Sequence, residues 1–297
     1  MSTTIGNINS LPQLTGTTQT APDAGAPKQE QTPPAAPQDE VTIGSVAKKA
    51  AKVIVGVPTA LAVGAVKGGI QSFGSAVTSA HTGLGIVENN KDAKFGEKCT
   101  SLLLNLSPMI GAAIGASGGP LGMVLGAMAG PGFTGGTIAA WSGGFQGINE
   151  GVDVAKALGN KAQEKVAPKM GEFAGKAAKV AASIATGLVA VPLFGISKAI
   201  DSSFDFAKKA VGIDKQPATK AEVPGQLMKL GAITFGYLNG LLGASGGIVN
   251  VILGGAQGVG SAATIVAGAE GGAKAFKEGA KEGYALGGKL IDRMTGN

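Results

Sequence analysis

The sequence predicts an all-α protein in which one helical unit occurs twice. Two stretches contain no Asp, Glu, Lys, Arg or His, from Cys99 to Asn149 and from Leu230 to Ala269. Both contain the word GASGG, which indicates a tandem duplication. Alternating β-branched and aromatic runs are missing, whereas Ala, Gly and Leu dominate, so we expect no strands.

The duplication divides the chain. GASGG occurs at Gly115–Gly119 and at Gly243–Gly247, an offset of 128 at which residues still agree at Gly159 and Gly287. Gly-rich sequence produces chance matches, but it rarely keeps one offset over such a length. We therefore predict three parts, a disordered tail at 1–41, helical repeat 1 at 42–166 and helical repeat 2 at 167–297.

The tail is rich in Ser, Thr, Pro and Gln and has no charged side chain before Asp23. Such a segment buries too little apolar surface to offset its ordering entropy, so we expect disorder. No basic residue precedes an apolar run at the start, which excludes a Sec or Tat signal peptide. The composition resembles bacterial type III secretion signals, which implies secretion by a route without a cleaved signal. The alternative is a plain flexible tail.

Each repeat is predicted to begin with a Lys-flanked helix, at about 45–73 and 170–208. The middles of these two helices are apolar and free of charge, at 53–66 and 180–197. Pro58 and Pro192 lie within them and should kink or break each helix there.

A charged connector follows, at 88–98 and 214–229, and leads into the charge-free stretch. This stretch is predicted to fold as a helical hairpin whose arms cover 101–117 and 120–140 in repeat 1, and 230–244 and 248–269 in repeat 2. The hinge residues are Ser117, Gly118 and Pro120 in repeat 1, and Ser245 and Gly246 in repeat 2. An amphipathic tail helix closes each repeat and is clearest at 270–294.

Glycines recur at every fourth position in the hairpins, the pattern called a glycine zipper. Residues four apart share a helix face, so each series clears a groove that another backbone can enter. In water each such Gly costs a helix roughly 1 kcal/mol relative to Ala, whereas a bilayer enforces the helix because broken backbone hydrogen bonds find no water. The predicted helix-packing residues are Gly111, Gly115, Gly119, Gly122, Gly126, Gly130, Gly243, Gly247, Gly254 and Gly258.

All lysines lie outside the two hairpins, as expected when hairpins enter a bilayer from one side. A spanning helix needs roughly 20 apolar residues, which the arms of repeat 1 approach, whereas the first arm of repeat 2 at 230–244 is short for a full span. Gly, Ser, Thr and Asn dilute all the arms, which suits a protein that is soluble first and inserts later. The lysines predicted to contact anionic headgroups are Lys48, Lys49, Lys52, Lys98, Lys176, Lys179, Lys229, Lys274, Lys277 and Lys281. The pattern resembles the hydrophobic hairpins of pore-forming toxins and secreted translocators.

Other function classes find little support. Arg293 is the only arginine and aromatic residues make up 4% of the chain, which argues against nucleic-acid binding. Cys99 and His81 are each the only residue of their type, so an internal disulfide, a multi-thiolate metal site and a His cluster are excluded. No phosphate-binding loop, HExxH or GxSxG sequence is present. We expect no cofactor, no metal and no catalytic residue, and predict that the protein is not an enzyme.

The sequence thus predicts a membrane-associated protein that inserts Gly-rich hairpins into a bilayer or remodels it. We expect it to act as a secreted bacterial effector or pore component, with anionic lipid as its partner and homo-oligomers formed through the glycine faces. The alternative is a soluble structural or interaction protein with a Gly/Ala-packed helical core and no membrane role.

Overall fold

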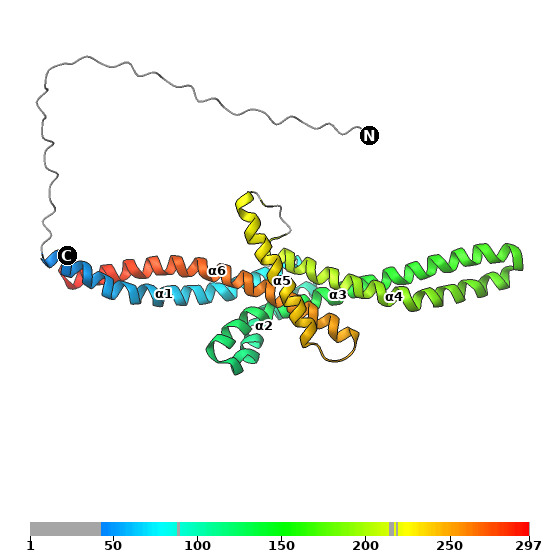
Figure 1. Cartoon of the computed structure of the whole chain (residues 1–297), viewed down its shortest axis with the longest axis horizontal. Coiled ribbons are helices and arrows are strands. Elements are labelled where there is room, and N and C mark those ends of the chain that lie inside the picture. Colours follow the sequence, from blue (N-terminus) through cyan, green and yellow to red (C-terminus); the bar gives the residue numbers. More distant parts are fainter. Residues whose placement is uncertain (1–42, 88–89, 214–216, 218, 297) are drawn as a thin grey trace, which may run out of the picture. The chain divides into compact units, whose positions relative to one another are not determined.

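The computed structural model describes residues 43–87, 90–213, 217 and 219–296. The predicted disordered tail at 1–41 lies outside these residues. The described residues form six α-helices and two 3₁₀ turns and contain no strand, which confirms the all-α prediction (Figure 1). The helices are α1 (Ile43–Leu84), α2 (Phe95–Gly115), α3 (Gly119–Met170), α4 (Glu172–Val211), α5 (Val223–Gly243) and α6 (Ile248–Met294). The 3₁₀ turns are η1 (Ala116–Gly118) and η2 (Lys220–Glu222).

Several helices are longer than the sequence predicts. α1 and α4 continue through Pro58 and Pro192, so the predicted interruption does not break either helix. α3 joins the second arm of the first hairpin to the tail of repeat 1, and α6 does the same in repeat 2. Pro131 lies inside α3 without ending it. One proline removes a single backbone donor, which neighbouring turns of a packed helix can tolerate.

Glycines with positive φ mark the sharp chain reversals. Gly171 has φ of 87° and is the one residue between α3 and α4. Gly119 has φ of 71° at the turn between α2 and α3. A side chain is strained at such a φ, so both positions favour glycine.

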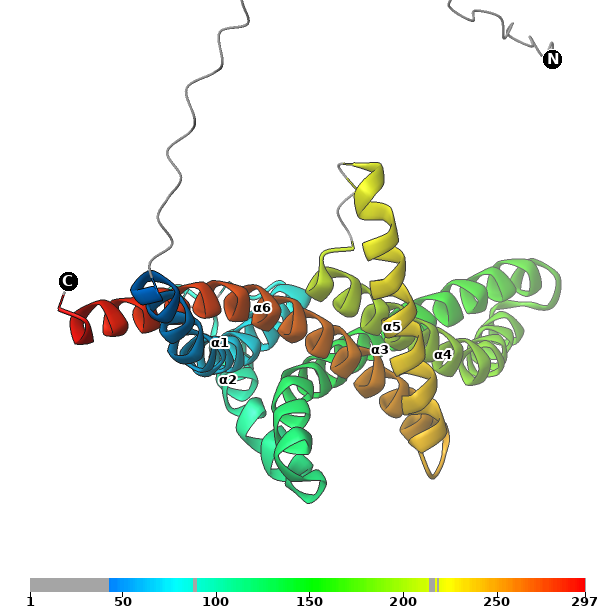
Figure 2. The ribbon, with the colours of Figure 1, turned by 60° about the vertical axis from the view of Figure 1, so that its left-hand side comes forward.

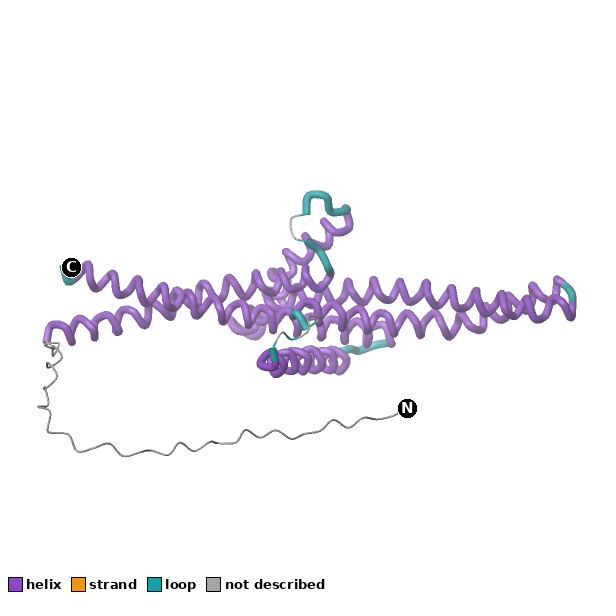
Figure 3. The backbone as a smooth tube through the Cα atoms, turned by 90° about the horizontal axis from the view of Figure 1, so that it is seen from above, coloured by secondary structure: helices purple, strands orange, loops and turns teal. Residues whose placement is uncertain are grey.

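The compact unit that begins at Gly44 contains two kinds of helix pair. The first hairpin consists of α2 and residues 119–140 of α3, and the second hairpin consists of α5 and residues 248–269 of α6. Two long pairs complete the unit. The α1/α6 pair joins α1 to residues 270–294 of α6, and the α3/α4 pair joins residues 141–170 of α3 to α4. Figures 2 and 3 show the partners of each long pair side by side.

A small core lies where the helices meet, and all six helices contribute to it. The buried residues of this cluster are Ala80, Leu104, Ala139, Phe206, Ala207, Ala210, Val211, Ile233, Val259 and Ala263. The Phe206 ring is 1% exposed. The ring fills the space left by Gly83 of α1 and Gly135 of α3. A Cβ at Gly83 would lie 2.6 Å from the ring, and a Cβ at Gly135 would lie about as close.

His81 lies at this core. It belongs to α1, is 2% exposed, and bridges two helices. Its Nδ1 lies 2.9 Å from the Val77 carbonyl oxygen, and its Nε2 lies 2.9 Å from the Ser101 hydroxyl oxygen of α2. The one histidine therefore has a structural role at the base of the first hairpin.

Replacing Phe206 by Ala should lower the free energy of unfolding by about 3–5 kcal/mol, because it opens a cavity where six helices meet. A denaturant titration followed by far-ultraviolet circular dichroism measures this change.

Phe173→Ala is the matched control, since Phe173 lies on the same helix and is 88% exposed. We expect it to change the free energy of unfolding by about 0.5 kcal/mol or less. Equal losses in the two variants would contradict the position of the core.

Candidate membrane-binding hairpins

The helices of the first hairpin pack backbone against backbone. A Cβ built on Gly111 would collide with the Gly126 carbonyl oxygen, and one on Gly115 would collide with that of Gly122. Gly130 faces the Ser107 carbonyl in the same way. Real Cβ atoms essentially never come within 3.0 Å of such an atom, so no side chain fits at these positions.

The second hairpin has the same kind of contact. Gly240 of α5 faces Gly254 of α6, and Gly236 faces Gly258, again too closely for a Cβ. The predicted packing residues Gly119, Gly243 and Gly247 are placed differently, with no described neighbour within 4 Å of their Cβ positions. These three residues lie at the hairpin tips.

The predicted hinge residues form the two tips. Ser117 and Gly118 lie in η1 and Pro120 is the second residue of α3, whereas Ser245 and Gly246 lie in the link between α5 and α6. All five are exposed. Both tips lie on the same side of the long pairs (Figures 1 and 2).

Large apolar side chains cover the outer faces of both hairpins. Ile114, Leu121 and Leu242 are the most exposed near the tips. Further exposed apolar residues of the hairpins are Leu102, Leu103, Leu106, Met109, Ile110, Val124, Phe133, Phe235, Leu238, Ile248 and Val249. Soluble monomers rarely expose contiguous apolar surface of this extent. With glycine inside and large side chains outside, the hairpins resemble helices that pack in lipid.

The lysines predicted to meet headgroups lie away from the tips. Lys98 and Lys229 are near the starts of α2 and α5, at the bases of the hairpins, and the other eight lie on the long pairs. Lys229 is ion-paired with Glu270 at 2.9 Å and also donates a hydrogen bond to the Val211 carbonyl.

Asp292 links the end of α6 to the beginning of α1. Lys52 donates a 2.9 Å hydrogen bond to its carboxylate, and the Lys48 ammonium lies 3.0 Å from it. These two lysines lower the pKa of the Asp292 carboxyl below its ordinary value. Lys48 and Lys52 therefore already have an acidic partner within the chain.

The structure also identifies apolar surface outside the hairpins. Four segments are long and apolar enough to cross a membrane, namely Gly44–Leu84, Phe95–Met170, Glu172–Val211 and Ile248–Met294. The most apolar stretch of α4 has a mean hydropathy of 1.9, and only 6% of it is buried. The most apolar stretch of α1 has a mean hydropathy of 1.7, and 17% of it is buried. The charge-free runs at 53–66 and 180–197 are the sequence signal for these two helices, although the prediction from sequence gives the spanning role to the hairpins alone.

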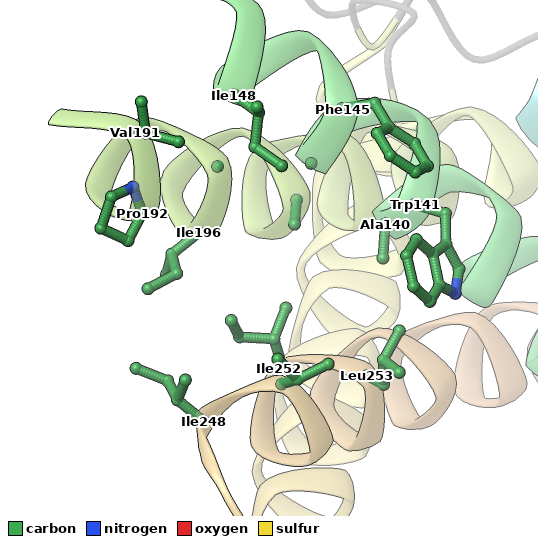
Figure 4. Close-up of a pocket in the computed structure, with 14 residues that line it drawn as sticks. Ala140, Trp141, Phe145, Ile148, Val191, Pro192, Ile196, Ile248, Ile252 and Leu253 are labelled. Atoms are coloured by element: carbon green, nitrogen blue, oxygen red, sulfur yellow. The ribbon is translucent and has the colours of Figure 1, made fainter. Parts of the chain in front are cut away.

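An apolar groove of about 370 Å³ lies beside the second hairpin, between α3, α4 and α6 (Figure 4). Trp141 and Phe145 of α3 stack on one wall, with ring centroids 5.6 Å apart. Pro192 and Ile196 come from α4, and Ile252 comes from α6. No charged side chain lines this groove. It extends the apolar surface of the hairpin to the base of the α3/α4 pair.

The described residues contain no group of three or more His, Cys, Asp or Glu that could hold a metal ion. No protein-family model matches the chain, and no curated protein or solved structure shows significant similarity to it.

Replacing Gly126 by Leu should force α2 away from α3, because the new side chain would overlap the Gly111 backbone. Spin labels on Leu103→Cys and Phe133→Cys, in a Cys99→Ser background, report the separation of the two helices. We expect a longer and broader distance distribution in the Gly126→Leu variant.

Gly231→Leu is the control, since Gly231 lies inside α5 with nothing within 4 Å of its Cβ position. It should leave the distance between α2 and α3 unchanged. An unchanged distance in the Gly126→Leu variant would show that the glycine contacts do not set the spacing.

Proposed function

We propose that this protein inserts its two Gly-rich hairpins into a lipid bilayer. The observation that carries this proposal is the combination, in both hairpins, of charge-free arms at 101–140 and 230–269, a glycine interior and an apolar outer surface. The four segments that are long and apolar enough to span make the chain compatible with a membrane.

Helix length and energy support insertion as hairpins. α2 contains 21 residues, close to the roughly 20 residues that cross a hydrocarbon core, and it belongs to a segment that is apolar enough to span. α5 has the same length but is not among the four such segments, and it is free of charge only from Leu230 onward. Backbone hydrogen bonds of a helix are satisfied internally, so the charge-free arms enter lipid without stranded polar groups. Gly and Asn keep the hairpins only moderately apolar, which favours a chain that remains in solution until it meets a bilayer.

We propose further that the unit arose by tandem duplication. Helix boundaries support this, since α2 covers 95–115 and α5 covers 223–243, an offset of 128 at both ends. Gly132 and Gly260 are separated by the same offset and face each other, each too close to the other's carbonyl for a Cβ. A residue that contacts its own equivalent is expected where a two-fold axis relates two copies.

The contacts of the long pairs follow the same relation. Gly143 of α3 faces Ser202 of α4, and its equivalent Gly271 of α6 faces Ser75 of α1. The first helix of each proposed repeat thus pairs with the last helix of the other repeat. This exchange explains why both repeats belong to one compact unit.

In this proposal the protein acts on a membrane rich in anionic lipid, as a secreted effector or pore component. The Ser/Thr-rich composition of residues 1–41 supports the proposal of a secreted protein. Self-association through the hairpin glycines requires the hairpins to open, because Gly111, Gly126 and their neighbours already face the partner helix. A soluble interaction protein is the alternative, and the exposed apolar surface speaks against it.

Lysine at the tips should prevent insertion. Leu121→Lys combined with Leu242→Lys places a charge on each tip, and each charge costs about 2.5–3.5 kcal/mol at the centre of a bilayer. We expect vesicle partitioning to fall at least roughly fiftyfold in the double variant. Flotation with phosphatidylserine-containing vesicles, followed by alkaline carbonate extraction, measures this.

Leu286→Lys is the matched control, since Leu286 is a half-exposed leucine of the charged part of α6. It should float like the unchanged protein. If the unchanged protein stays monodisperse without lipid and ignores anionic vesicles, the soluble alternative holds. Dye release from the same vesicles separates a pore from an anchor.

A further inference from the structure

Two helices outside the hairpins expose an apolar surface that the hairpins do not explain. Ile54 and Leu61 of α1 are mostly exposed, as are Ile184 and Leu188 of α4. Leu188 alone is 74% exposed. Each of these helices could cross a membrane by length and composition, so its place relative to the bilayer must be decided by what it contacts.

α1 is packed along the charged part of α6. A Cβ at Gly56 would lie 2.9 Å from the Tyr284 ring, and one at Gly68 would lie 3.1 Å from the Gly272 carbonyl oxygen. Lys67 is ion-paired with Glu282 between the same helices. The ionised residues of this part of α6 are Glu270, Lys274, Lys277, Glu278, Lys281, Glu282, Lys289, Asp292 and Arg293.

α4 is packed along the charged part of α3 in the same way. A Cβ at Gly151 would lie 2.7 Å from the Val191 Cα, and one at Gly195 would lie 3.2 Å from the Ile148 side chain. Lys198 and Glu150 form a 3.2 Å ion pair across the two helices. The ionised residues of this part of α3 are Glu150, Asp153, Lys156, Lys161, Glu164, Lys165 and Lys169.

These partners exclude a spanning orientation for the long pairs. If α1 or α4 crossed the bilayer, its partner would carry many charges into the hydrocarbon, or the close contacts between them would be lost. A pair with one apolar helix and one charged helix instead suits the membrane interface, where the apolar side enters the headgroup and acyl boundary.

We infer that the two long pairs lie flat in the headgroup region of an anionic bilayer, with α1 and α4 toward the acyl chains. This inference rests on the proposed hairpin insertion, which brings the unit to the membrane. Along most of the α1/α6 pair α1 lies on the side of the hairpin tips, and the first part of α4 returns on that side of α3 (Figure 1).

The charge distribution complements such a surface. The α1/α6 pair has nine basic and four acidic side chains, and the α3/α4 pair has nine basic and six acidic ones. The long pairs therefore hold an excess of eight basic groups, whereas the hairpins between 101–140 and 230–269 hold no charge. Juxtamembrane lysines are attracted to anionic lipid within a Debye length of the surface.

Fluorophores at single cysteines test this arrangement in the full-length chain with Cys99→Ser. Leu61→Cys and Leu188→Cys report the apolar helices, and Lys161→Cys and Lys281→Cys are the matched positions on their charged partners. Ser117→Cys reports a hairpin tip. Each protein is bound to phosphatidylserine-containing vesicles whose lipids are brominated near the glycerol end or near the chain ends.

We expect the labels at 61 and 188 to shift to shorter emission wavelength and to be quenched most by the shallow bromines. Labels at 161 and 281 should stay accessible to aqueous iodide. Labels at 61 and 188 that stay accessible to iodide, or that are quenched most by the deep bromines, would overturn the in-plane orientation. Labels at 61 and 188 that are shielded from iodide but are not quenched by brominated lipid would indicate contact with a second copy of the chain. This result would also overturn the in-plane orientation.

The label at 117 separates this inference from the proposed function. Deep quenching at 117 together with exposed labels at 61 and 188 leaves hairpin insertion intact and refutes the flat long pairs. Shallow quenching at 61 and 188 with an aqueous tip refutes hairpin insertion and supports the flat long pairs.

Discussion

The unit depends on the approach of backbones at glycine pairs that leave no room for a Cβ. Gly132 of α3 and Gly260 of α6 make this contact where the two longest helices meet, and the hairpins repeat it at Gly126 and Gly240. Close backbone contact gains dispersion energy over many atoms without burying large side chains. The helices therefore associate without the usual supply of buried Leu and Ile.

This way of packing determines the surface. Since glycine and alanine occupy most inner positions, the large apolar side chains point outward, and the fully buried ones are few, with Phe206, Leu104 and Ile233 the largest. A soluble bundle has the opposite distribution, because burial of large apolar side chains is its main source of stability. The exposed surface and the glycine interior are two consequences of one constraint, and together they suit a lipid environment.

The helical class and the positions of the two turns, at 116–118 and 244–247, could be predicted from the sequence, because charge-free runs and the GASGG words are local signals. The continuous helices α3 and α6 were missed, since a hairpin arm and an amphipathic tail differ in composition even where no residue ends the helix. The pairing of α1 with α6 depends on contacts between residues about 200 positions apart or more, which no local pattern records. The burial of His81 in α1 could not be predicted either, because its neighbours in the sequence are polar.

The exchange of first helices between the proposed repeats has a consequence for membrane entry. Figure 2 shows both hairpin tips on one side of the long pairs, as the proposed two-fold relation about the Gly132 and Gly260 contact would place them. Both hairpins can then enter a bilayer from the same face, and neither the charged connectors nor the charged parts of α3 and α6 need to cross it. An inverted relation between the repeats would place the tips on opposite sides and would force a charged segment through the hydrocarbon. The direction of the two-fold axis is therefore what makes two charge-free hairpins and two charged long pairs compatible with a single membrane surface.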